Sequence, residues 1–255
     1  MDYELLRRFE RQKLQFYKNA ALPRKSSRVL EFARNLCSDL SLPSVVLHSG
    51  LQLLDRVGQF IDIEDSMVST MAAVCTFIGS KVEMNPEEIP CVRKFLPAVG
   101  NGNLIAEDFR SLEVNVLRVL EWSTVSATPA HFLPSFVRKQ PLLDALVGQS
   151  RGAGRGSFVD TTLLVLAEEV GGARLNSLPS EISSVVFHLM LTEALPHLNA
   201  SEIVEEVTGY SVERDLQECR RQLVDRTRVW DLLKSKLPKN ISPRSTLNLV
   251  HEERN

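Results

Sequence analysis

Apolar residues recur mostly every three or four positions along this chain, which is the spacing of one face of an α-helix. The most apolar stretch, residues 67–78, also carries small residues on its remaining faces and ends in Gly79-Ser80-Lys81. A helix that is apolar nearly all round has to be enclosed by other helices. At about 12 to 16 residues it is too short to cross a bilayer. The stretch therefore predicts the central core helix of a bundle.

The same spacing predicts helices along most of the chain, so the fold class is expected to be all-α. A charged first helix over 3–18 has a loose apolar stripe and should lie across the bundle or a partner. Five helices are then expected in each half, a weak internal repeat. Their expected ranges are 28–40, 43–60, 67–82, 87–99 and 105–122 in the first half, and 129–147, 157–170, 179–194, 201–208 and 212–236 in the second.

Composition places the chain among ordinary soluble globular proteins. Of its 255 residues 44% are apolar and 24% are charged, and the formal net charge is −2. Neither an 18-residue apolar segment nor a signal-peptide profile at the N-terminus is seen, so an intracellular protein without a membrane span is expected. The four cysteines are scattered without a C-x-x-C pair, which is typical of reduced packing thiols.

Candidate chemistry is sparse. The five histidines are dispersed, without metal-ligand spacing or a nucleophile beside them, so neither a catalytic constellation nor a cofactor or metal is expected. The glycine-rich segment 151–156 lacks the Gly-Lys-Ser/Thr of a phosphate loop and follows an expected helix, which favours a plain loop. The polar residues from Pro238 onward favour a flexible tail.

Three short motifs occur in order over the first half: Leu-Leu-Asp-Arg at 53–56, Gly-Ser-Lys at 79–81, and the run from Glu113 to Trp122. Their order and spacing resemble the cyclin box, the five-helix module of cyclins. Thr-Pro-x-x-Phe-Leu at 128–133 is similar to the segment that joins two such boxes. The resemblance implies two consecutive five-helix cyclin-box domains. The implied units are an N-terminal helix (1–22), an N-terminal box (23–127), a C-terminal box (128–237) and a flexible tail (238–255).

The resemblance also implies a kinase-binding surface. Lys81 and Glu113 match the two residues that flank the surface on which cyclins grip a mobile helix of the kinase, although from the residues alone each is a solvated charge. An ammonium group at a helix C-terminus has three donors for the backbone carbonyls of a docked chain. The apolar pocket between them is implied to consist of Ile78, Val82, Leu117 and Trp122. Val82 stands where the family usually has an aromatic residue.

Arg56 is implied to have a structural role. Its counterpart in the family pairs with an acid on the first box helix, and Glu31 occupies the matching position. The resemblance thus predicts a buried Glu31–Arg56 ion pair, in which the loss of one partner strands a charge at a cost of about 3 to 5 kcal/mol.

The implied function is that of a non-catalytic cyclin, which binds and activates a cyclin-dependent serine/threonine protein kinase as a heterodimer in cell-cycle control. The alternative is a cyclin-fold transcription factor that binds nucleic acid, which requires a strongly basic face. Basic bias is confined to the last helix and tail, so nucleic acid is not the expected partner. Segments such as Thr-Gly-Tyr-Ser at 208–211 are most similar to cyclin J-type sequences, with herpesvirus cyclins as the second choice.

Overall fold

The computed structural model describes residues 3–12, 27–100, 104–149, 158–173, 177–226 and 229–236. Regular structure within these ranges is helical throughout, without a strand, which confirms the predicted all-α class. The glycine-rich segment 151–156 and the expected tail 238–255 lie outside the described residues. So does the continuation of the first helix beyond residue 12.

The first half is a bundle organised around one enclosed helix. It consists of α3 (Ser27–Asp39), α4 (Ser44–Val57), α5 (Val68–Glu83), α6 (Val92–Val99) and α7 (Ala106–Val119). α5 lies against all four of the others. Every residue from Thr70 to Ser80 is buried, on all faces of the helix. The prediction of a central core helix is therefore confirmed.

The second half has its own hydrophobic cluster, centred on a second enclosed helix, α11. Its helices are α8 (Pro129–Arg138), α9 (Pro141–Gln149), α10 (Phe158–Ala173), α11 (Pro179–Ala194), α12 (Ala200–Thr208), α13 (Gln217–Arg226) and α14 (Val229–Lys236). α11 lies against α8, α12, α13 and α14. Each half of the chain thus repeats the plan of one buried helix surrounded by others.

Several helices are shorter than the periodicity predicts. The expected helix 129–147 is two helices, because Pro141 lacks the N–H that would continue α8 and instead begins α9. The expected helix 87–99, for which the sequence already predicts an interruption near Pro90, begins only at Val92. The expected helix 212–236 is divided into α13 and α14. At Pro90 and Pro141 the apolar spacing thus continues across a break in the backbone hydrogen bonding.

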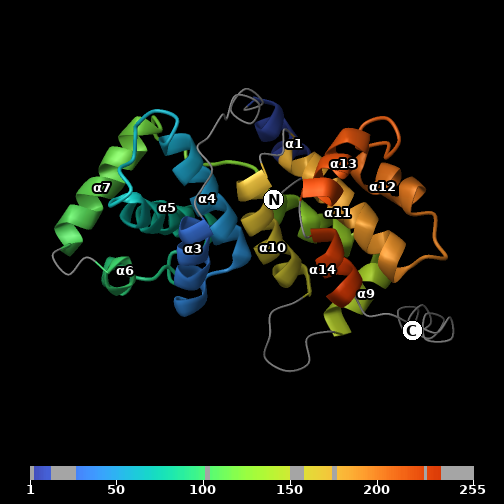
Figure 1. Cartoon of the computed structure of the whole chain (residues 1–255), viewed down its shortest axis with the longest axis horizontal. Helices are drawn as coiled ribbons and strands as arrows, with labels where there is room; N and C mark the ends of the chain where they lie inside the picture. The colour runs from blue at the N-terminus through green and yellow to red at the C-terminus, as the bar shows by residue number, and fades with distance from the viewer. Residues whose placement is uncertain are drawn as a thin grey trace.

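The two halves meet along α10. This helix belongs to the second half in sequence, but it lies against α3 and α4 as well as α8, α9 and α14, and it stands between the two groups in Figure 1. Its Ala167 is buried in the hydrophobic cluster of the first half, while Leu163 and Leu166 are buried in that of the second. Val45 of α4 packs against both clusters. The halves consequently share apolar contacts along one helix.

The first helix, α1 (Tyr3–Gln12), lies on the second half of the chain. Leu6 is buried in the cluster of that half, and the Tyr3 hydroxyl donates to the Thr208 carbonyl (2.6 Å). The ring of Tyr3 also meets the edges of Phe132 and Phe136. A helix this polar is held by such tertiary contacts, since short isolated helices are marginal in water.

Candidate functional site

Lys81 and Glu113 lie side by side at the surface of the first half. Lys81 belongs to the last turn of α5 and Glu113 to the middle of α7, and the Lys81 Nζ is 2.6 Å from the Glu113 Oε1. The Lys81 side chain is 42% exposed, whereas that of Glu113 is 11% exposed. The Lys81 Nζ also lies 4.3 Å from the centre of the Phe77 ring, one turn earlier on α5. The structure thus brings the two predicted charged residues together.

The arrangement leaves binding capacity at both groups. An ammonium group has three N–H donors and a carboxylate about four acceptor sites, and the ion pair uses one of each. Because Lys81 stands at the C-terminal end of α5, the helix dipole favours its charge by about 0.3–1 kcal/mol. The half-exposed ammonium can donate to carbonyls of another chain while the carboxylate beneath it accepts N–H groups.

Three of the four predicted apolar site residues reach the surface. Trp122 is 66% exposed, and Val82 and Leu117 are partly buried. The backbone N–H of Trp122 donates to the Leu117 carbonyl (2.8 Å) just beyond the end of α7. Trp122 has a φ of 60°, in the left-handed region that residues other than glycine rarely adopt. The backbone of Trp122 is thus fixed at the end of α7, and its indole is largely exposed.

Ile78 does not belong to this surface. It is 2% exposed and lies in the hydrophobic cluster of the first half. The reason is the enclosure of α5, whose residues up to Ser80 are covered by the surrounding helices. Ile78 is therefore a core residue in the structure, and the exposed part of the apolar site consists of Val82, Leu117 and Trp122.

Glu31 and Arg56 do not form the buried ion pair that the resemblance implies. Glu31 is exposed on α3, whereas Arg56 is buried near the end of α4. The Arg56 Nη1 donates to the Ser126 hydroxyl (3.3 Å) in the segment before α8. A carboxylate that stays in water cannot satisfy a buried guanidinium, so Arg56 instead contacts the segment that joins the two halves.

A polar cluster at the other end of α4 was not predicted from the sequence. The Glu83 carboxylate, at the end of α5, accepts from the Ser49 hydroxyl (2.6 Å) and lies 3.1 Å from His131 Nε2. The Thr128 N–H donates to His131 Nδ1 (3.1 Å). The available signal was Thr128 followed three positions later by a side chain that can reach back to it, which is the spacing of a capping box.

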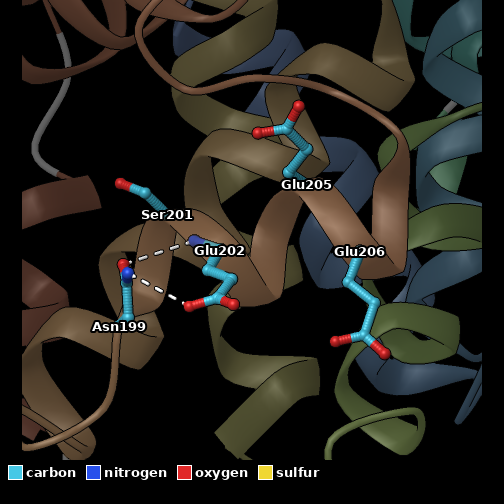
Figure 2. A pocket seen from close by; sticks show the side chains of 5 residues that line it. All are labelled: Asn199, Ser201, Glu202, Glu205 and Glu206. Carbon is cyan, nitrogen blue, oxygen red and sulfur yellow. Dashed lines mark hydrogen bonds between the residues drawn. The ribbon is translucent and has the colours of Figure 1, made fainter.

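An open pocket of about 570 Å³ lies on α12, in the second half. Figure 2 shows its lining, Asn199, Ser201, Glu202, Glu205 and Glu206, with Asn199 accepting from the Glu202 N–H at the start of the helix. Glu205 pairs with Arg214 (3.2 Å). Across the described residues no three His, Cys, Asp or Glu side chains are placed to hold a metal ion. The polar groups of this pocket cap and brace α12.

Three of the four cysteines are buried, as the sequence predicts for packing thiols. These are Cys37, Cys75 and Cys219, whereas Cys91 is exposed, and none of the four forms a disulfide. Burial raises the pKa of Cys37 and of Cys219 to about 12, so neither thiol is a nucleophile near neutral pH.

None of the described helices combines the length and apolar character that a bilayer span requires.

Comparison with known proteins decides the family. A family model for the cyclin N-terminal domain matches residues 6–125, which include the Lys81–Glu113 pair. The X-ray structure of a viral cyclin from herpesvirus saimiri superposes with a TM-score of 0.61, and the alignment covers 92% of this chain and 98% of that one. Residues 6–125 match the N-terminal domain of the cyclin family. At 16% identity the viral structure is a likeness of fold.

Two curated cyclins illustrate how distant the relatives are. The G1/S-specific cyclin-D1 of Xenopus laevis is 25% identical over 123 residues, which are 48% of this chain and 41% of that protein. The G1/S-specific cyclin-E1 of Danio rerio is 24% identical over 208 residues, 79% of this chain and 47% of that protein. The chain thus matches less than half the length of either relative. These relatives leave the J-type resemblance untested, and it stays a prediction.

Proposed function

We propose that this chain is a cyclin that binds and activates a cyclin-dependent serine/threonine protein kinase, as the non-catalytic subunit of an intracellular heterodimer in cell-cycle control. The observation that carries the proposal is the preformed Lys81–Glu113 pair, in which the Lys81 side chain is 42% exposed. Val82 follows Lys81 in α5, Leu117 lies one turn after Glu113 in α7, and the largely exposed Trp122 follows the end of α7. These residues offer a side-chain donor and a side-chain acceptor for the peptide groups of a partner, together with apolar side chains. They suit a partner that presents both peptide groups and apolar side chains, such as the end of a helix.

Docking on this surface would activate a kinase by selecting one of its conformations. Phosphoryl transfer requires an ion pair between a lysine and a helix-borne glutamate of the kinase. A subunit that binds only the conformation with that helix in place shifts the population toward it, by as much as its affinity for the two states differs. The role of Lys81 and Glu113 is then to hold the backbone of the moving helix. Val82, Leu117 and Trp122 cover its apolar face.

The experiment compares two pairs of charged residues. The variant Lys81→Ala with Glu113→Ala removes the proposed binding groups. The control, Glu107→Ala with Arg110→Ala, removes an exposed ion pair on α7, whose charged atoms are 3.9 Å apart. The exposed control pair contributes only about 0–1 kcal/mol to stability, so its removal should keep the fold. Glu113 is buried, but because Lys81 is removed with it no unpaired charge is left, so the first variant should also keep the fold. We expect the first variant to lose kinase binding and activation, measured against a panel of purified cyclin-dependent kinases, and the control to retain both.

A charge exchange separates binding from structure more sharply. Lys81→Glu with Glu113→Lys retains an ion pair between α5 and α7 but presents opposite charges to the partner. If the pair acts only within this chain, the exchange preserves activation; if it grips the kinase, the exchange abolishes it. Normal activation by either Lys81–Glu113 variant would contradict the assignment of this surface. Failure of the unaltered chain to bind any kinase of the panel would contradict the function itself.

A further inference from the structure

Glu83 joins the end of α5 to two other helices. It is the last residue of α5, two positions after Lys81, and its side chain is about one-tenth exposed. One carboxylate oxygen accepts from the Ser49 hydroxyl of α4 (2.6 Å), and the other lies 3.1 Å from His131 Nε2 of α8. The last turn of α5 is therefore held by the first half through Ser49 and by the second half through His131.

The hydrogen bonds of His131 indicate which of its two ring nitrogens acts as the donor. Nδ1 accepts from the Thr128 N–H (3.1 Å), and the Thr128 hydroxyl oxygen lies 2.8 Å from the same nitrogen. A ring nitrogen that accepts carries no proton, so in the neutral ring the N–H is on Nε2 and points to Glu83. The backbone at the start of α8 thus fixes both the orientation of the ring and the direction of its bond to Glu83.

The consequence for Lys81 follows from its place in the same turn. The final backbone groups of a helix lack partners within the helix, so helix ends fray unless side chains hold them. Here the last turn is closed by the Met84 N–H, which donates to the Ser80 carbonyl (3.0 Å). Lys81 faces α7 from this turn, and Glu83 faces α4 and α8. Holding Glu83 therefore holds the backbone that carries Lys81.

We propose that His131 is a positioning residue for kinase docking: through Glu83 it fixes the last turn of α5, and with it the Lys81 ammonium. The second half of the chain, which lies outside the predicted kinase-binding residues, thereby sets how well the first half binds. The inference rests on the proposed function of Lys81. It extends that function to a side chain 48 positions away from Glu83 in sequence.

The variant that tests this is His131→Gln. A glutamine at the third helical position can still accept the N–H of Thr128, as in an ordinary capping box, but it cannot also donate to Glu83 in the direction of the imidazole Nε2. The start of α8 is kept and the bond to α5 is lost. The matched control is Ser44→Ala, which removes another hydrogen bond between the halves, from Ser44 to Asp160 (3.3 Å), without altering a contact of Glu83.

Two measurements decide the outcome. Kinase affinity should fall roughly 3- to 30-fold in His131→Gln and stay unchanged in Ser44→Ala. In the Lys81→Ala background the same histidine substitution should have no further effect, because it acts through Lys81. Amide hydrogen exchange of the free chain should accelerate over residues 81–84 in His131→Gln alone. That second readout does not require a kinase.

Each alternative result has a defined meaning. Equal losses of affinity in the presence and absence of Lys81 would overturn the inference, because His131 would then act by another route. Unchanged exchange over residues 81–84 would overturn it as well. If the unaltered chain binds no kinase, the proposed function fails, and hydrogen exchange alone decides whether His131 holds the end of α5.

Discussion

Glu10 is a carboxylate on α1 that is fully buried against the first turn of α11. One of its oxygens accepts the Ser180 N–H (2.7 Å) and the other the Ser180 hydroxyl (2.6 Å). The N–H groups in the first turn of a helix have no partner within it, so Glu10 caps α11 from a distant part of the chain. Arg7, one turn earlier, donates to the same hydroxyl oxygen (2.9 Å).

Burial dominates the ionisation of this group. It raises the pKa of Glu10 above the ordinary value of 4.5, although the hydrogen bonds from Ser180 and the charge of Arg7 work in the opposite direction. The folded chain therefore holds the Glu10 proton more tightly than the unfolded chain does. The stability that this difference contributes is fully present below pH 4.5 and is lost as the pH rises through the folded pKa.

The substitution Glu10→Gln removes the titration while keeping an acceptor for the Ser180 N–H. We expect the unaltered chain to lose stability relative to this variant as the pH is raised from 4.5 to 7.5. The measurement is the free energy of unfolding in urea for both chains at several pH values. A difference that is independent of pH, or that favours the unaltered chain as pH rises, would show that burial does not govern this carboxyl.

At the scale of elements, α4 and α5 pack so closely that their backbones are in contact at Gly50 and Gly79. A Cβ added at Gly50 would lie 2.9 Å from the Thr76 Cα, and one added at Gly79 would lie 3.2 Å from the Gly50 nitrogen. Atoms this close belong to backbone, which cannot move aside as a side-chain tip can. The two glycines thus allow the contact between α4 and the enclosed helix α5.

Gly50→Ala should destabilise the protein by about 1–3 kcal/mol, because the added methyl group forces the helices apart. This cost exceeds the gain in helix propensity of about 1 kcal/mol from replacing glycine. Gly58→Ala is the control, since its Cβ would meet nothing nearer than the Leu54 carbonyl oxygen at 3.5 Å, and its φ of −64° suits alanine. Urea unfolding measures both, and equal stability of the two variants would contradict the close crossing.

Helical periodicity predicted these elements well and their ends less well. The 3.6-residue spacing identifies a buried face, so the enclosure of α5 could be predicted from residues 67–78 alone. The spacing does not reveal where a backbone hydrogen bond is missing. The helix expected over 129–147 therefore included Pro141, at which a new helix begins in the structure. Likewise, the expected helix 105–122 ends at Val119, because the backbone of Glu121 and Trp122 is left-handed.

The site could be predicted in part for a related reason. Lys81 and Glu113 were expected at one surface because each belongs to a motif whose order and spacing resemble the cyclin box. In the structure the two side chains lie together. Local patterns do not report which distant side chains meet. The cluster of Glu83 and His131 was therefore missed, and Glu31 was assigned to Arg56 although it stays in water. Burial of Ile78 depends on the whole bundle rather than on its own spacing.

For the whole molecule, the decisive feature is the sharing of α10 between two hydrophobic clusters. Separation of the halves would remove Ala167 of α10 from the first cluster and Val45 of α4 from the second. It would also break the hydrogen bond between His48 Nε2, in the first half, and the Leu163 carbonyl (2.9 Å). That carbonyl lies within α10 and keeps its helical donor, so separation loses the net contribution of one hydrogen bond, about 0.5–1.5 kcal/mol. We therefore expect the two halves to unfold as one cooperative unit.

Native-state hydrogen exchange tests this cooperativity, with α5 and α11 as reporters because each is the enclosed helix of its own half. Their slowest amides exchange through the largest unfolding event available to them. If that event includes both halves, Gly50→Ala must lower protection in α11 by the same free energy as in α5, although Gly50 belongs to the first half. Gly58→Ala should lower neither. Loss of protection confined to α5 would mean that the halves unfold separately, and that contact through α10 is too weak to couple them.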